Sequence, residues 1–150
     1  MDDLAVRPEI RAWLAIDRAH HVLSRLLQQH MAHYGLTKPQ YTVLRTLGEQ
    51  QSASLSELAA SMDVTLGNLT GIVDRLEAAD LVRRQRDATD RRSLRLQITP
   101  AGRELYQQAV PSTRGCVREL FSALSPQEIS ELERLLEKLL AQLHLEEVPA

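Results

Sequence analysis

Apolar residues recur at helical spacing over two long stretches, one near each end of the chain. In the first stretch they follow steps of three and four from Ile10 to Tyr34, and Gly35 is a natural stop. These positions are Ile10, Trp13, Leu14, Leu23, Leu26, Leu27 and Met31. The second stretch begins with a capping signal, Ser125 to Glu128, and continues through Ile129, Leu132, Leu136, Leu139 and Leu143. The pattern predicts a long helix with one apolar face at each end.

Three shorter helices are predicted between these stretches, each with its own start signal. Thr37 with Gln40, and Ser54 with Glu57, form capping boxes, and Thr65 is a further N-cap. The second and third of these helices, residues 56–62 and 66–79, are separated by a turn of only three residues. This spacing is typical of a helix–turn–helix.

The hydrophobic period then changes from helical to alternating. Leu94, Leu96 and Ile98 alternate with polar residues, which predicts a half-buried strand. Residues 81–86 can pair with it across the polar turn 87–90. A further helix is predicted from Pro100 through Pro111 to Phe121. The order indicates a mainly α protein with a small β-hairpin wing (α+β), that is, a winged helix–turn–helix.

Composition narrows the class of protein. The 150 residues are 43% hydrophobic but only 3% aromatic, which fits one soluble, largely helical domain. The apolar runs are too short for a membrane span, and the acidic start lacks the features of a secretory signal. Cys116 is the only cysteine, which excludes an intramolecular disulfide framework. We therefore expect a cytoplasmic protein without membrane association.

Enzymatic function is not expected from the motifs. The sequence has no Gly-rich phosphate loop, no zinc-protease histidine motif and no nucleophile elbow. We predict no catalytic residues, no cofactor and no metal site.

Positive charge is concentrated in one segment, although the whole chain carries a net charge of −2. Residues 83–103 contain arginine but no lysine, and arginine is well suited to phosphates and base edges. The arginines are Arg83, Arg84, Arg86, Arg91, Arg92, Arg95 and Arg103. A basic segment of this kind is typical of a protein that binds a polyanion.

The predicted helix 66–79 has two different faces. At 100° per residue, the apolar face contains Leu66, Leu69, Ile72, Val73 and Leu76. The opposite face contains Gly67, Asn68, Gly71, Asp74 and Arg75. A glycine inside a helix costs about 1 kcal/mol relative to alanine. Two of them on one face favour close approach of the backbone to a groove wall; the alternative is that they only loosen the helix.

These features predict a set of contacts with double-stranded DNA. Asn68 is the candidate for an adenine edge, and Arg75 for a phosphate or a guanine. Thr65 and Thr70 are candidates for phosphates. Close approach at Gly67 and Gly71, and the hairpin residues Arg84, Arg86, Asp90, Arg91 and Arg92, complete the predicted DNA-binding set.

The same stretch resembles the MarR family of transcription regulators. The resemblance rests on VDRLEAADLV and DATDRRSLRLQITPAGREL within residues 55–105, and on LTKPQYTVLRTL before them. It implies an N-terminal dimerisation helix over residues 1–36, a DNA-binding lobe over 37–104 and C-terminal dimerisation helices over 105–150. The first and last helices would interlock in a homodimer that represses transcription from a pseudopalindromic operator.

Two details of the resemblance concern the DNA contacts. Asp90 and Arg92 match a wing-tip pair in which the aspartate holds an arginine that enters the minor groove. Gly67 and Gly71 depart from the family pattern, which commonly has side chains there. This departure leaves the DNA sequence that is read open.

The resemblance also implies release of DNA by a small aromatic or anionic ligand, by oxidation or by a metal. Candidates to line a ligand cleft between the dimer helices and the DNA-binding lobe are Trp13, His20, Arg25, Tyr34 and Tyr41, with packing as the alternative role of Trp13 and Tyr41.

Redox and metal sensing are the alternatives within the family. Cys116 is expected to be a core or interface residue rather than a redox sensor. His20, His21, His30 and His33 lack the carboxylates of a tight metal site. Outside the family, the alternative is a winged-helix module that binds protein and not DNA, against which the seven arginines argue.

Overall fold

The computed structural model describes residues 7–86 and 94–146, which contain six helices and three strands. In chain order they are α1 (Pro8–Ala32), α2 (Lys38–Gln50), β1 (Ser52–Ser54), α3 (Leu55–Met62), α4 (Leu66–Ala78), β2 (Val82–Arg86), β3 (Leu94–Ile98), α5 (Pro100–Leu120) and α6 (Pro126–Glu146). The predicted fold class, a mainly helical protein with a small antiparallel sheet, is confirmed. None of the described helices is both long and apolar enough to cross a membrane.

The sheet has one strand more than the predicted hairpin. Strands β2 and β3 pair antiparallel as expected, with Val82 opposite Ile98. The additional strand β1 lies along the other edge of β3, with Ala53 opposite Leu96, so the strand order is β1-β3-β2. Three residues are too few to reveal an alternating pattern. The pairing depends on a partner more than forty residues away in the sequence, and local pattern does not contain it.

The helices begin at the predicted caps. Ser54 Oγ accepts from the backbone N–H of Glu57 at 3.1 Å, while a Glu57 carboxylate oxygen accepts from the backbone N–H of Ser54 at 2.7 Å. Hydrogen bonds that the backbone and the side chain of Ser54 make to the Glu57 carboxylate are the main reason that the pKa of Glu57 lies below its ordinary value. Thr37 and Gln40 form the same box at α2. Thr99 Oγ1 accepts from the N–H of Gly102 at the start of α5.

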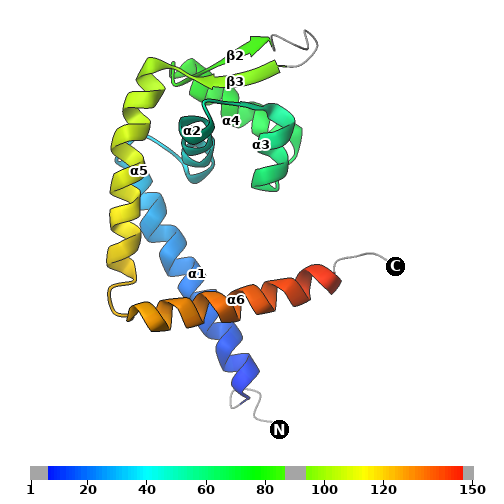
Figure 1. The fold of residues 1–150 in the computed structure, drawn as a ribbon, viewed down its shortest axis with the longest axis vertical. Helices are drawn as coiled ribbons and strands as arrows, with labels where there is room; N and C mark the ends of the chain where they lie inside the picture. The colour runs from blue at the N-terminus through cyan, green and yellow to red at the C-terminus, as the bar shows by residue number, and fades with distance from the viewer. Residues whose placement is uncertain (1–6, 87–93, 147–150) are drawn as a thin grey trace. The chain divides into compact units, whose positions relative to one another are not determined.

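The chain divides into two compact units, residues 1–114 and 115–150. In the first unit, α2, α3 and α4 gather on one side of the strands (Figure 1). Their apolar side chains meet those of the sheet in a continuous core, in which Leu47, Leu69, Val73 and Leu96 are completely buried. The core fixes α4 to the sheet and thereby sets the orientation of its opposite face.

The second unit contains the end of α5 and helix α6. Ser125 and Glu128 cap α6 by reciprocal hydrogen bonds of 3.3 and 2.8 Å. None of the side chains described in α6, residues 126–143, is buried. Five of its leucines are between 38% and 49% exposed, namely Leu132, Leu135, Leu139, Leu140 and Leu143. The predicted apolar face of this helix is therefore open in the single chain.

Candidate nucleic-acid interface

Helix α4 is held from its inner face and from its N-terminus. Leu69, Val73 and Leu76 are completely buried, as predicted for the apolar face. Thr65 Oγ1 accepts a hydrogen bond of 3.2 Å from the backbone N–H of Asn68, which caps the helix. Asp63, in the left-handed conformation with φ 52°, ends α3 and allows the tight turn into α4. The outer face of α4 is thus presented by a fixed helix.

Leu66 is an exception to the predicted apolar face. Its side chain is 52% exposed, whereas Ile72 in the same predicted set is 7% exposed. Side chains on a helix lean toward its N-terminus. At the first position of α4, this lean carries the leucine beyond the end of the helix and away from the core. The prediction that Leu66 is buried is wrong for this reason.

Gly67 and Gly71 lie on the open face of α4. Both are exposed, and a Cβ atom added to either would meet no atom within 4 Å. The fold itself therefore does not require a glycine at these two positions. At these two glycines the helix backbone is exposed on the surface without a side chain. Close approach of the helix to a groove wall requires such a surface.

The polar residues predicted on α4 differ in the hydrogen bonds still open to them. Thr70 Oγ1 donates to the backbone oxygen of Leu66 at 2.8 Å, so its hydroxyl hydrogen is already engaged. Thr65 only accepts at the cap and keeps its hydroxyl hydrogen for a phosphate. Asn68 and Arg75 are exposed, and no hydrogen bond or ion pair to another described residue engages their side chains.

The N-terminal end of α4 also differs from those of α3 and α6 in charge. Glu57 and Glu128 lie in the first turns of α3 and α6, but α4 has no acidic residue there. Asn68 occupies the corresponding position. No carboxylate in the first turn of α4 compensates the partial positive charge of the helix end, which favours an anion such as phosphate.

Arg84 has a different environment from the other predicted DNA-binding residues. From β2 its guanidinium reaches α4, where it donates to Asp74 Oδ1 at 2.6 Å and pairs closely with the carboxylate of Glu77. Glu77 also accepts from the backbone N–H of Arg84 at 2.9 Å. The Arg84 side chain is only 23% exposed. Its pairs with Asp74 and Glu77 make Arg84 a link between α4 and the β2–β3 hairpin.

The electrostatics of this link follow from its two acids. Burial acts to lower the pKa of Arg84, but the hydrogen bonds and charges of Asp74 and Glu77 more than offset it, so the pKa is raised. With two carboxylates on one guanidinium, its positive charge is compensated inside the chain. We therefore assign Arg84 a positioning role and leave it out of the proposed contacts with phosphate.

Two further arginines of the basic segment also have partners inside the chain. Arg83 donates to Gln97 Oε1 at 3.2 Å across the hairpin. Arg95 donates to Ser52 Oγ at 3.3 Å and lies 4.0 Å from the carboxylate of Glu57, which ties β3 to β1 and α3. Sequence reasoning missed this role because it depends on β1. Arg86 is exposed at the end of β2. The predicted contacts Asp90, Arg91 and Arg92 lie outside the described residues.

Comparison with known proteins agrees with this architecture. A family model described as the MarR family matches residues 36–94. The transcriptional repressor MprA of Escherichia coli K12 is 34% identical over 128 residues, which cover 82% of this chain and 73% of MprA. The transcriptional regulator HosA of E. coli O157:H7 is 32% identical over 83% of this chain and 96% of its own length.

The chain belongs to the MarR family. Solved structures of this family have the same fold. AbsC, a MarR family transcriptional regulator from Streptomyces coelicolor, aligns with a TM-score of 0.84 and 27% identity over 93% of this chain and 97% of AbsC. A mutant of MarR from E. coli in complex with operator DNA aligns with a TM-score of 0.79 and 26% identity over 93% of this chain and 99% of that one. These relatives are transcriptional regulators, which points away from an enzymatic activity.

The predicted ligand residues of this MarR-family chain are not brought together within one chain. Trp13 is 63% exposed on α1, and His20 and Arg25 are exposed further along the same helix. Tyr34 follows the end of α1, and a helix rises about 1.5 Å per residue, so it lies roughly 30 Å from Trp13. Tyr41 is 7% exposed and belongs to the core. A small ligand cannot contact all five residues of one chain.

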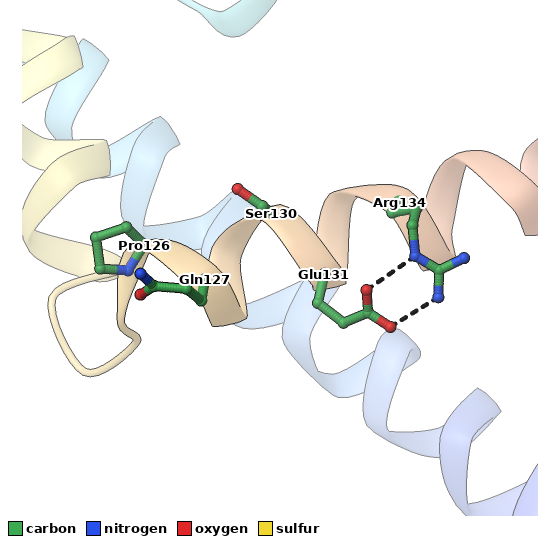
Figure 2. A pocket seen from close by; sticks show the side chains of 5 residues that line it. All are labelled: Pro126, Gln127, Ser130, Glu131 and Arg134. Carbon is green, nitrogen blue, oxygen red and sulfur yellow. Dashed lines mark hydrogen bonds and ion pairs between the residues drawn. The ribbon is translucent and has the colours of Figure 1, made fainter.

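Two surface pockets are present elsewhere in the MarR-family fold. One, of about 490 Å³, lies between α2 and α3 and includes Arg45, Glu49 and Glu57 in its lining. Figure 2 shows the other, of about 410 Å³, where Pro126, Gln127 and Ser130 follow the start of α6 and Glu131 pairs with Arg134 at 2.7 Å. Neither pocket includes a predicted ligand residue.

The histidines of α1 have structural partners. His30 Nε2 lies 3.1 Å from Ser112 Oγ on α5, and its ring stacks on that of His33. Within the described parts of the chain, no three His, Cys, Asp or Glu side chains are grouped to hold a metal ion. Cys116 is half-buried and is a free cysteine.

Proposed function

We propose that this chain is a homodimeric repressor of transcription that binds a pseudopalindromic operator in double-stranded DNA. The observation that carries the proposal is the open face of α4. The exposed glycines Gly67 and Gly71, a first turn without an acidic residue, and the side chains of Asn68 and Arg75, which pair with no described residue, all lie on this one helix. Bare backbone, an amide, a guanidinium and a positive helix end form a surface suited to the major groove.

The proposed DNA contacts come from two parts of the chain, helix α4 and the wing. The backbone at Gly67 and Gly71 approaches the groove wall, Asn68 reads an adenine, and Arg75 contacts a guanine or a phosphate. Thr65 donates its hydroxyl hydrogen to a phosphate. Arg86, with Arg91 and Arg92 of the wing, provides positive charge for the adjacent backbone and minor groove. Arg84 holds the wing at a fixed position against α4.

Assembly as a dimer is supported by the uncovered apolar faces. Trp13, Leu14 and Ile16 on α1 are between 41% and 63% exposed, and the α6 leucines are open as well. A helix face with several exposed large apolar side chains is typical of an interaction site on a soluble protein. A second copy presents the same two helices and can cover them symmetrically. Two copies also place two recognition helices on one duplex.

Release by a small aromatic or anionic ligand completes the proposed function. Trp13 offers an exposed ring, and His20 and Arg25 offer polar and positive groups further along α1. An effector of this kind acts if it binds the DNA-free conformation more tightly than the bound one. A panel of aromatic carboxylates should include one that both raises the melting temperature and releases DNA. Release only by peroxide, lost in Cys116→Ser, would establish redox sensing instead.

Binding of the full chain to a random duplex at increasing salt tests the DNA-binding claim itself. We expect the logarithm of the affinity to fall linearly with the logarithm of the salt concentration, because bound arginines release counterions. The control is the same titration with Arg86→Gln, which should have a smaller slope. No binding at low salt would favour a protein-interaction module.

A further inference from the structure

The side chain of Leu66 is more than half exposed, unlike the apolar residues of α4 that belong to the core. Every other large apolar residue of α4 is at most 7% exposed, whereas Leu66 is 52% exposed at the first position of the helix. Its backbone oxygen accepts from Thr70, and its side chain is not part of the buried core. The N-terminal residues of a recognition helix are those that reach base edges in the major groove. Leu66 therefore lies where DNA is read.

The neighbours of Leu66 leave room for its side chain to reach a base. Gly67 follows directly, Gly71 lies one turn later, and neither carries a side chain. At 100° per residue, Leu66 and Asn68 flank the two glycines on opposite sides. The front of α4 thus has one apolar group on one flank and one amide on the other.

This pairing of groups matches the chemistry of one base pair in particular. In the major groove, the thymine C5-methyl is the apolar group among donors and acceptors, and adenine presents the edge that suits an asparagine. We propose that Leu66 is a specificity-determining residue that contacts a thymine methyl in each half-site. The assignment rests on the proposed DNA binding. To the adenine contact of Asn68 it adds a preference for thymine, which is recognised by Leu66.

Uracil isolates this contact because it pairs like thymine and lacks only the methyl group. Binding of the full chain is measured on its selected operator, with each thymine of the half-site replaced in turn by uracil in both half-sites. Removing one buried methyl is worth a factor of about four in affinity. At one thymine position, replacement by uracil should lower the affinity of the wild type about fourfold for each half-site. Leu66→Ala should bind the thymine operator more weakly and no longer distinguish uracil there.

Two variants serve as controls. Asn68→Ala should bind weakly but still distinguish thymine from uracil. Leu66→Met keeps an apolar side chain of similar volume at the same position, and it should still distinguish thymine from uracil. Leu66 is exposed, so the melting temperature of Leu66→Ala should be unchanged.

The outcomes separate this assignment from the proposed function. Specific binding without a thymine–uracil difference at any position would overturn the role of Leu66 and leave the DNA binding intact. So would discrimination that survives Leu66→Ala. Absence of specific DNA binding by the wild type would contradict both.

Discussion

Helices α4 and α6 both have an apolar face, but only the apolar face of α4 is covered by the rest of the chain. In α4, 13 residues long, the stripe is covered by the core, with Leu69, Val73 and Leu76 completely buried. In α6, 21 residues long, no side chain between residues 126 and 143 is buried. When the chain covers the apolar face of a helix, the opposite face is free to bind. When it does not, the apolar face itself is available to a partner, as proposed for the dimer.

The largest effect is expected from charging the open face of α6. Leu136→Glu with Leu139→Glu places four charges in the proposed dimer interface. Each buried leucine contributes about 2 kcal/mol, so dimerisation should weaken by several orders of magnitude and specific DNA binding should be lost. Sedimentation velocity measures the change. The matched control, Gln127→Glu with Ser130→Glu, adds the same charge on the polar face of α6 and should remain dimeric. A native dimer of the leucine variant would contradict the assigned interface.

A smaller effect is expected when the open face of α4 is filled. Gly67→Leu or Gly71→Leu should raise the free energy of unfolding by up to about 1 kcal/mol, because helix propensity improves and nothing stands in the way. Operator affinity should fall tenfold or more, since each base contact is worth about 1–3 kcal/mol. Fluorescence anisotropy and thermal melting measure the two quantities.

Gly102 provides the control for these glycines. A Cβ atom there would collide with the backbone oxygen of Leu81, so Gly102→Ala should destabilise the chain. Full operator binding by both leucine variants would mean that α4 does not approach DNA closely.

Next in size is the link between α4 and the wing. Arg84→Ala removes the guanidinium that joins Asp74 and Glu77, and should lower the free energy of unfolding by about 1 kcal/mol, given the partial exposure of the two acids. It should also weaken operator binding, because the wing is no longer held in place. Arg83→Ala removes the same charge from the same strand and should be milder in both assays. Equal effects of the two variants would make Arg84 an ordinary source of charge.

Removal of a wing arginine should weaken binding without affecting the fold. Arg92→Ala is expected to reduce affinity for operator and random DNA alike, and to lower the salt slope by about one. Asp90→Ala should also weaken binding if the aspartate holds Arg92 by a charge-assisted hydrogen bond. Tighter binding by Asp90→Ala would show that it acts only through its charge.

The smallest effect concerns the helix caps, and at α6 it depends on pH. Glu128 accepts hydrogen bonds from Ser125, which lower its pKa below the ordinary 4.5. The stability it contributes is therefore present above that value and lost as the pH falls through the lowered pKa. Glu128→Gln should have a slightly lower melting temperature than the wild type at neutral pH. The difference between the two melting temperatures should vanish at acidic pH.

The cap of α4 contains no carboxylate and serves as the comparison. Thr65→Ala should cost about 1 kcal/mol at any pH. A pH-dependent effect of Thr65→Ala, or a pH-independent effect of Glu128→Gln, would contradict this account of the two caps.

Local signals in the sequence were enough for most of the fold. The caps at Thr37, Ser54 and Thr65 are formed by residues three apart, and the alternation of β3 is visible in five residues, so helices and wing were predicted. Strand β1 was missed because its pairing with β3 is long-range.

The site was predicted less completely, for the same physical reason. The partners of Arg84 and Arg95 lie on other elements of the fold. The sequence therefore did not reveal these ion pairs, and both arginines were counted as available positive charge. A helical wheel placed Leu66 with the buried residues because it treats the helix as endless. The glycine face depends only on helical spacing and was found.

Selection of bound duplexes from a random pool by the full wild-type chain tests the central claim most directly. Two recognition helices of a symmetric dimer should enrich an inverted repeat whose half-sites are centred about 10 base pairs, one helical turn, apart. Each half-site should contain an A·T pair at a fixed position, for Asn68 and Leu66. A pool that remains random after repeated rounds, or an enriched sequence without two-fold symmetry, would contradict the account.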